Sequence, residues 1–121
     1  MKNIPLEDLE IYKMAMEIGE DVWNIVITWD IFKKKTIGNQ LVRSSDTIAA
    51  NIAEGYGRYQ FDEKRQFSFC RRASLFETKT WLMKAHNRSF ISEAETKDFQ
   101  RRLLTLGMKL NNNIKNLNNN K

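Results

Sequence analysis

The sequence predicts an all-α protein, a single domain folded as an antiparallel up-down four-helix bundle. Its 121 residues contain one proline, Pro5, so long helices are easily accommodated. Apolar residues recur at spacings of three and four, and no alternating run rich in Val, Ile and Thr indicates a strand. The length suits one hydrophobic core. Four helical segments joined by short loops then give the bundle.

The first helix is expected over residues 5–28, because Pro5 is tolerated in a first helical turn. Its apolar stripe is expected to contain Leu9, Tyr12, Met16, Gly19, Trp23 and Val26. The stretch TWDIFKKKT is interpreted as a break. A second helix is expected over residues 35–55, with a stripe that consists of Ile37, Leu41, Ser44, Ser45, Ile48 and Ile52. The small side chains of Ser44, Ser45, Ala49 and Ala53 predict a close helix crossing.

The third and fourth helices are expected over residues 62–89 and 92–117. Asp62 is a suitable N-cap for the former, and Ser92 with Glu95 forms a capping box for the latter. The last helix carries an apolar seam that includes Phe99, Leu103, Leu106 and Leu110.

The helix over residues 62–89 carries two apolar or small stripes on nearly opposite sides. One stripe contains Phe67, Cys70, Ser74, Thr78, Trp81 and Ala85, and the other contains Phe69, Ala73, Phe76, Thr80 and Met83. One bundle core needs a single stripe, and exposed aromatic patches are rare in monomers. The second stripe therefore predicts self-association, as a closed ring or a dimer.

Composition excludes several classes of protein. No apolar run approaches the roughly 20 residues of a membrane span, so no membrane partner is expected. A single cysteine, and the lack of a recognisable signal segment at the start of the sequence, favour a cytoplasmic location. No spacing of His, Cys or carboxylate residues suggests a metal site, and no cofactor motif or nucleophile–base pair is recognisable. A noncatalytic protein without cofactors is therefore predicted.

The motif NIAEGYGR, residues 51–58, is interpreted as a structural joint. GYG lacks the third glycine of a dinucleotide fingerprint and a preceding strand, so it is a weak phosphate loop. Gly55 is expected just beyond the helix end, in the left-handed conformation that glycine favours. Arg43, Asn51 and Glu54 are expected to form a polar seam against a neighbouring helix.

Charge is distributed unevenly along the chain. Residues 1–32 carry two basic and seven acidic side chains, a net charge of −5, and the remainder carries +10. Basic clusters of this kind serve solubility or bind a polyanion. The candidate nucleic-acid-binding residues are Arg58, Lys64, Arg65, Arg71, Arg72, Lys79, Arg101 and Arg102.

QLVRSSDTIAANIAEGYGR, RASLFETKTWLMKA and FISEAE closely resemble the bacterial four-helix-bundle proteins encoded by intervening sequences within 23S ribosomal RNA genes. That family includes the accessory variability protein of diversity-generating retroelements. The resemblance leaves the subfamily open. The positions that match its structural motif include Arg43, Asn51, Glu54, Gly55, Gly57, Arg58 and Glu77.

The resemblance implies a noncatalytic bundle, commonly a basic, barrel-like homopentamer. It implies nucleic acid, RNA above all, as a partner, with a reverse transcriptase as a further partner in the retroelement branch. The leading hypothesis is a self-associating bundle that binds RNA or other nucleic acid through a basic surface. The alternative is a protein–protein interaction scaffold with no nucleic-acid role.

Overall fold

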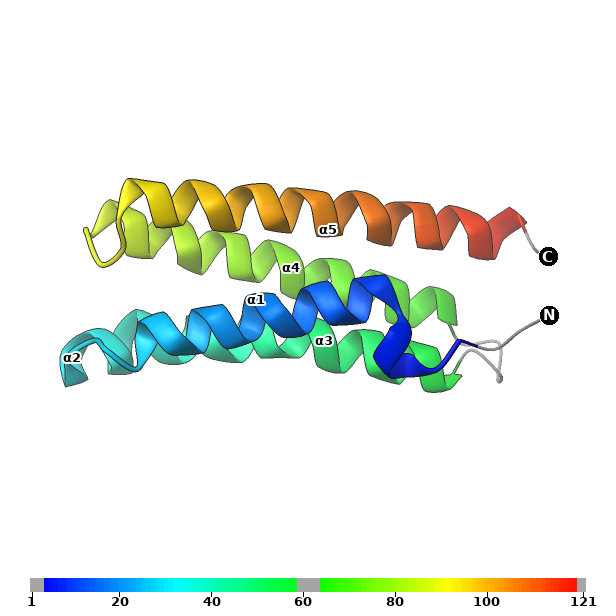
Figure 1. Ribbon diagram of the computed structural model, residues 1–121, viewed down its shortest axis with the longest axis horizontal. Helices are drawn as coiled ribbons and strands as arrows, with labels where there is room; N and C mark the ends of the chain where they lie inside the picture. Colours follow the sequence, from blue (N-terminus) through cyan, green and yellow to red (C-terminus); the bar gives the residue numbers. More distant parts are fainter. Residues whose placement is uncertain (1–3, 59–63, 120–121) are drawn as a thin grey trace.

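The computed structural model consists of four long helices packed against each other, with no strand among the residues described (Figure 1). It describes the backbone of residues 4–58 and 64–119, and the side chains of residues 4–57 and 72–112. The long helices are α1 (Glu10–Val26), α3 (Asn39–Arg58), α4 (Lys64–Asn87) and α5 (Glu93–Asn119). The predicted fold class is confirmed.

The helices follow one another around the bundle in the order α1, α3, α4, α5. Helix α3 packs on α1 and α4, and α5 packs on α4 and α1. The pair of helices α1 and α3 therefore lies on the opposite side of the bundle from the pair α4 and α5 (Figure 1). The α1–α3 and α4–α5 connections lie at one end, and the chain termini lie near the other.

The predicted stripe of α3 forms the centre of the core. Ile37, Leu41, Ile48 and Ile52 are buried, and Ser44 and Ser45 are fully buried among them. Each serine hydroxyl donates to a carbonyl of the preceding turn, to Leu41 at 3.3 Å and to Val42 at 3.1 Å. The small side chains therefore permit close packing without an unpaired buried hydroxyl.

The buried face of α1 differs from the expected stripe. The core side chains are Ile11, Ala15, Ile18, Val22 and Val26. Tyr12 is half-buried, while Met16 and Trp23 are exposed. The prediction was correct for Gly19 and Val26, which are buried, and wrong for Met16 and Trp23. Helix α1 carries two neighbouring apolar stripes, and periodicity alone did not indicate which one faces the core.

The start of α1 and both ends of α3 differ from the predicted boundaries. Pro5 begins a 3-10 turn (Leu6–Asp8) and not α1, because Leu9 is extended. A short α2 (Ile31–Lys33) and a π-helical turn (Lys34–Gly38) lead directly into α3, so the predicted break is shorter than expected. At the other end α3 continues to Arg58, and no glycine described has a positive φ. Gly55 therefore does not end the helix.

Gly55 is buried within α3, and three more helical residues follow it. Tyr56 of the same motif donates a hydrogen bond to the Ile4 carbonyl, which ties the N-terminal segment to α3.

The connections near α5 follow local sequence rules. Ser92 Oγ accepts from Glu95 N, and Glu95 Oε1 accepts from Ser92 N, both at 3.0 Å, which confirms the predicted capping box. Ser89 has a φ of 61° and ends α4, while Phe90 N donates to the Ala85 carbonyl at 2.8 Å. The predicted cap Asp62 lies outside the residues described.

Candidate functional site

Polar side chains of the predicted motif form a seam between α3 and α4. Arg43 Nη2 lies 2.9 Å from Glu77 Oε2, which also accepts from Trp81 Nε1 at 3.1 Å. Farther along, Asn51 Nδ2 donates to Ser74 Oγ at 3.5 Å. The structure thus brings Arg43, Asn51 and Glu77 to one helix interface. Glu54 and Gly57 are exposed on α3, and a Cβ at Gly57 would have no neighbour within 4 Å.

The predicted nucleic-acid-binding cations have different surroundings. Arg102 is 21% exposed and bridges Asp21 of α1 at 2.8 Å and Asp98 of α5 at 3.4 Å. Arg101 also pairs with Asp98 but is exposed. Lys79 Nζ lies 5.2 Å from the Phe76 ring centroid. The Arg102 ion pairs therefore tie α5 to α1, and this cation is less available to an external phosphate.

Arg72 of α4 is half-buried and takes part in further interactions. The side chains of Arg58, Lys64, Arg65 and Arg71 lie outside the part of the chain that the structure describes, so these remain predictions.

Five cations that are not among the predicted nucleic-acid-binding residues lie together at one end of the bundle. This end contains the α1–α3 and α4–α5 connections. Lys33 Nζ lies 5.1 Å from the centroid of Phe90, whose ring meets Trp29 edge-on at 5.4 Å. The π-helical turn also packs on α4, whose last turn carries Lys84. We call this group the basic end, and it consists of Lys33, Lys34, Lys35, Lys84 and Arg88.

Two apolar side chains project from the basic end. Ile31 and Phe32 of α2 are 68% and 73% exposed, among the largest values for apolar side chains in the described part. Asp30 caps α2 by accepting from Lys33 N at 3.0 Å, which holds the lysine-bearing turn in a helical conformation. An aromatic ring and several cations are therefore presented together.

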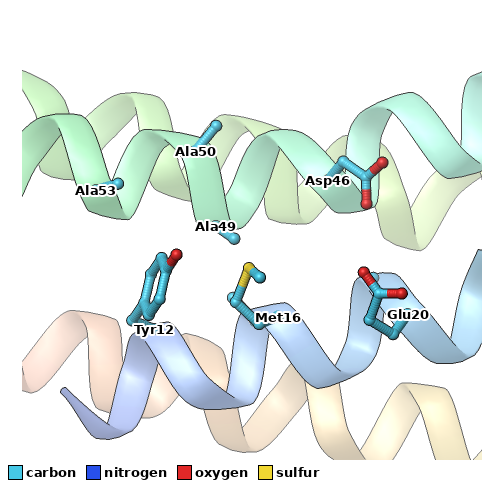
Figure 2. A pocket seen from close by; sticks show the side chains of 9 residues that line it. Tyr12, Met16, Glu20, Asp46, Ala49, Ala50 and Ala53 are labelled. Atoms are coloured by element: carbon cyan, nitrogen blue, oxygen red, sulfur yellow. The ribbon is translucent and has the colours of Figure 1, made fainter. Parts of the chain in front are cut away.

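The surface between α1 and α3 contains two grooves. The alanine groove is lined by Tyr12, Ala15, Met16, Gly19, Glu20, Asp46, Ala49, Ala50 and Ala53. Figure 2 shows Tyr12, Met16 and Glu20 of α1 facing Asp46 and Ala49 of α3. A Cβ on Gly19 would lie 2.8 Å from Asp46 Oδ1, so glycine leaves room for this carboxylate.

The two carboxylates of the alanine groove face each other without a cation. Burial raises the pKa of the Asp46 carboxyl above its ordinary value, and the negative charge of Glu20 raises it further. Neither carboxylate has a hydrogen-bond or ion-pair partner among the side chains described. The groove thus combines an apolar floor with uncompensated negative charge.

The second groove lies nearer the basic end. The tryptophan groove is lined by Trp23, Val26, Ile27, Lys34, Asn39, Val42 and Arg43. Trp23 of α1 and Ile27, which follows the end of α1, are 49% and 43% exposed, and Met16 of the alanine groove is 42% exposed. The two grooves together are called the α1/α3 face below.

A second apolar surface lies on the opposite side of the bundle. Phe76 and Met83 of α4 and Leu104 and Met108 of α5 are 38–58% exposed. Gln100 Nε2 lies 2.9 Å from Met83 Sδ, and Leu104 and Met108 follow Gln100 by one and two helical turns. These four side chains and Lys79 are called the α4/α5 face. The predicted second stripe of residues 62–89 is exposed at each member whose side chain is described: Ala73, Phe76, Thr80 and Met83.

Sequence reasoning missed the α1/α3 face and the basic end for different reasons. The run Lys33–Lys35 was visible, but it was interpreted only as part of a break. Glu20 and Asp46 meet only because α1 packs on α3. Within the described residues no group of His, Cys, Asp and Glu side chains is placed to hold a metal ion, and no helix is long and apolar enough to cross a membrane.

Comparison with known proteins identifies a family. Residues 7–112 match the model of the 23S rRNA-intervening sequence protein family. No curated protein matches the chain.

Proposed function

The chain belongs to the 23S rRNA-intervening sequence protein family, and we propose that it is a noncatalytic, self-associating bundle that binds RNA or other nucleic acid through a basic surface. Self-association would cover the two apolar faces, since large exposed apolar patches mark interaction sites. Light scattering at micromolar concentration should then give a mass well above the 14.3 kDa of one chain. A monomer mass would refute this part of the proposal.

The observation that carries the nucleic-acid role is the basic end. Three consecutive lysines lie on α2 and the π-helical turn, and Lys84 and Arg88 come from the end of α4. A nucleic-acid backbone is bound when several cationic side chains contact neighbouring phosphates at once, and the basic end groups such side chains at one end of the bundle. Exposed Phe32 offers a surface on which an unpaired base stacks.

RNA binding is tested by fluorescence anisotropy with a hairpin RNA that has an unpaired loop, at 50 and 200 mM salt. If Lys33, Lys34 and Lys35 contact three phosphates, replacing all three by alanine lowers the slope of log affinity against log salt by about 2.7. Their contribution to the loss of affinity between these two salt concentrations is then roughly 40-fold. Phe32→Ala should weaken binding to the loop without changing the salt slope.

The matched control neutralises three lysines elsewhere. Lys13, Lys109 and Lys115 lie on α1 and α5, in the half of each helix that is far from α2, and Lys109 pairs with Glu10 at 2.6 Å. Their replacement by alanine changes net charge equally and should leave the salt slope nearly unchanged. No binding by the wild-type protein at 50 mM salt would refute the nucleic-acid role. Equal losses in the two triple variants would place binding outside the basic end.

A further inference from the structure

We propose that the α1/α3 face of one copy binds the α4/α5 face of a second copy, with Lys79 of the second copy placed between Glu20 and Asp46 of the first. This inference rests on the proposed self-association and assigns the surfaces that carry it. It makes the contact head to tail, because the two faces are different and lie on opposite sides of the bundle.

Both faces expose apolar side chains that the fold of one chain leaves uncovered. Met16, Trp23 and Ile27 lie on the α1/α3 face, and Phe76, Met83, Leu104 and Met108 lie on the α4/α5 face. These are the large side chains that dominate interface energetics, whereas the floor of the alanine groove is made of methyl groups. The small side chains of the alanine groove therefore leave room for a bulky side chain of the α4/α5 face.

The heights of the key residues along the bundle also match. The Asn51–Ser74 hydrogen bond sets a common level on the antiparallel helices α3 and α4. Asp46 lies five residues before Asn51, and Lys79 lies five residues after Ser74, so both are about 7.5 Å from that level in the same direction. Lys79 and Asp46 thus lie at about the same height on opposite sides of one chain.

The same relation holds for the apolar groups on either side of Lys79. Phe76 lies two residues after Ser74, level with Ala49 in the alanine groove. Met83 lies nine residues after Ser74, level with Val42 in the tryptophan groove. A neighbour related by rotation about an axis parallel to the helices, without a shift along it, therefore presents Phe76, Lys79 and Met83 to three matching places.

Charge favours the same pairing. Glu20 and Asp46 repel each other in the isolated chain, and a cation placed between them would relieve that repulsion. Lys79 is half-buried and lies above the Phe76 ring on the opposite face. Complementary charges across an apolar contact fix its register and speed association.

A head-to-tail contact has a consequence for assembly. Each copy has one α1/α3 face and one α4/α5 face. An open row of copies joined by this contact therefore always has an unused α1/α3 face at one end and an unused α4/α5 face at the other. The assembly closes only as a ring, and a twofold dimer built from one self-complementary patch does not use this contact.

Charge reversal tests the assignment. Lys79→Glu and Asp46→Lys should each weaken association at least about tenfold, as measured by light scattering and sedimentation over a concentration series. The double variant, which exchanges the two charges, should restore the wild-type mass. Circular dichroism of each variant checks that helicity is kept, and Arg88→Glu, a reversal at the end of α4 outside both faces, should leave the mass unchanged.

The outcomes separate this inference from the proposed function. A wild-type monomer mass at all concentrations would refute self-association itself. A wild-type oligomer that both single variants preserve would overturn this interface and leave self-association standing. Two disrupted single variants without rescue in the folded double variant would overturn the Lys79–Asp46 pairing. Co-purification of a different protein on the α1/α3 face, with no self-association, would likewise overturn the assignment.

Discussion

The two interfaces of α3 differ in how many of their side chains find partners within one chain. Towards α4, Arg43, Glu77, Trp81, Asn51 and Ser74 form a polar seam in which each group has a partner. Towards α1, the outer edge exposes apolar side chains and brings two carboxylates together without a cation. The polar groups of the α3–α4 seam have their partners within one chain, whereas the α1/α3 face is the surface that we propose binds a second copy.

This difference separates residues that stabilise the fold from residues that are available to a partner. Substitutions in the seam and core should lower the stability of one chain, while substitutions on the α1/α3 face should act on association. The Leu104→Arg variant, altered at an exposed position of the α4/α5 face, provides a background in which stability is measured without assembly.

The largest contrast is expected between Ile48 and Trp23. Ile48 is completely buried, so Ile48→Ala should lower the free energy of unfolding by about 2–5 kcal/mol. Trp23 is 49% exposed, so Trp23→Ala should cost the monomer about 1 kcal/mol or less but reduce association in the wild-type background. Urea unfolding measures the first effect and light scattering the second. Equal losses of monomer stability would show that Trp23 belongs to the core.

A smaller contrast is expected between two glutamates. Glu77→Ala removes the partner of Arg43 and Trp81 and should destabilise the chain by about 1 kcal/mol, since the pair is partly exposed. Glu20→Ala removes a repulsion with Asp46 and should not destabilise it. Thermal unfolding of both variants in the Leu104→Arg background compares them directly. Destabilisation by Glu20→Ala as large as that by Glu77→Ala would contradict the distinction.

The smallest effect concerns the pH dependence of Asp46. The pKa of the Asp46 carboxyl is raised in the folded chain by burial and by the negative charge of Glu20. Glu20 and Tyr12 are the titratable side chains of α1 that line the same groove. Folding stability contributed by the Asp46 carboxyl is therefore present below its ordinary pKa of 3.8 and is lost as pH rises through the raised value. Asp46→Asn should slightly raise the melting temperature at pH 7 and have no such effect at pH 3. A melting temperature lowered at pH 7 would reverse the sign.

The sequence predicted those parts of the fold that depend on one helix at a time. The stripe containing Ser44, Ser45 and Ile48 and the Ser92–Glu95 box were correct because periodicity and capping are local. The choice between the two stripes of α1 depends on how α1 is rotated against α3. Gly55 carried the signal of a helix end, although α3 continues past it to Arg58.

The candidate site was predictable only where its residues share a helix. The second stripe of residues 62–89 anticipated Phe76 and Met83, and both are exposed as a partner surface requires. Glu20 and Asp46 are 26 positions apart in the sequence and lie on different helices. They come close together only because α1 packs on α3. The same limit applies to the match in height between Asp46 and Lys79.

The most direct test of the open α1/α3 face mixes two variants that each lack one face. Ala50→Arg obstructs the alanine groove, and Leu104→Arg obstructs the α4/α5 face, both at exposed positions. Each variant alone should scatter light as a monomer of 14.3 kDa, and an equimolar mixture should contain a species of twice that mass. A mixture that remains monomeric, or either variant alone at the wild-type mass, would contradict a head-to-tail contact between these faces.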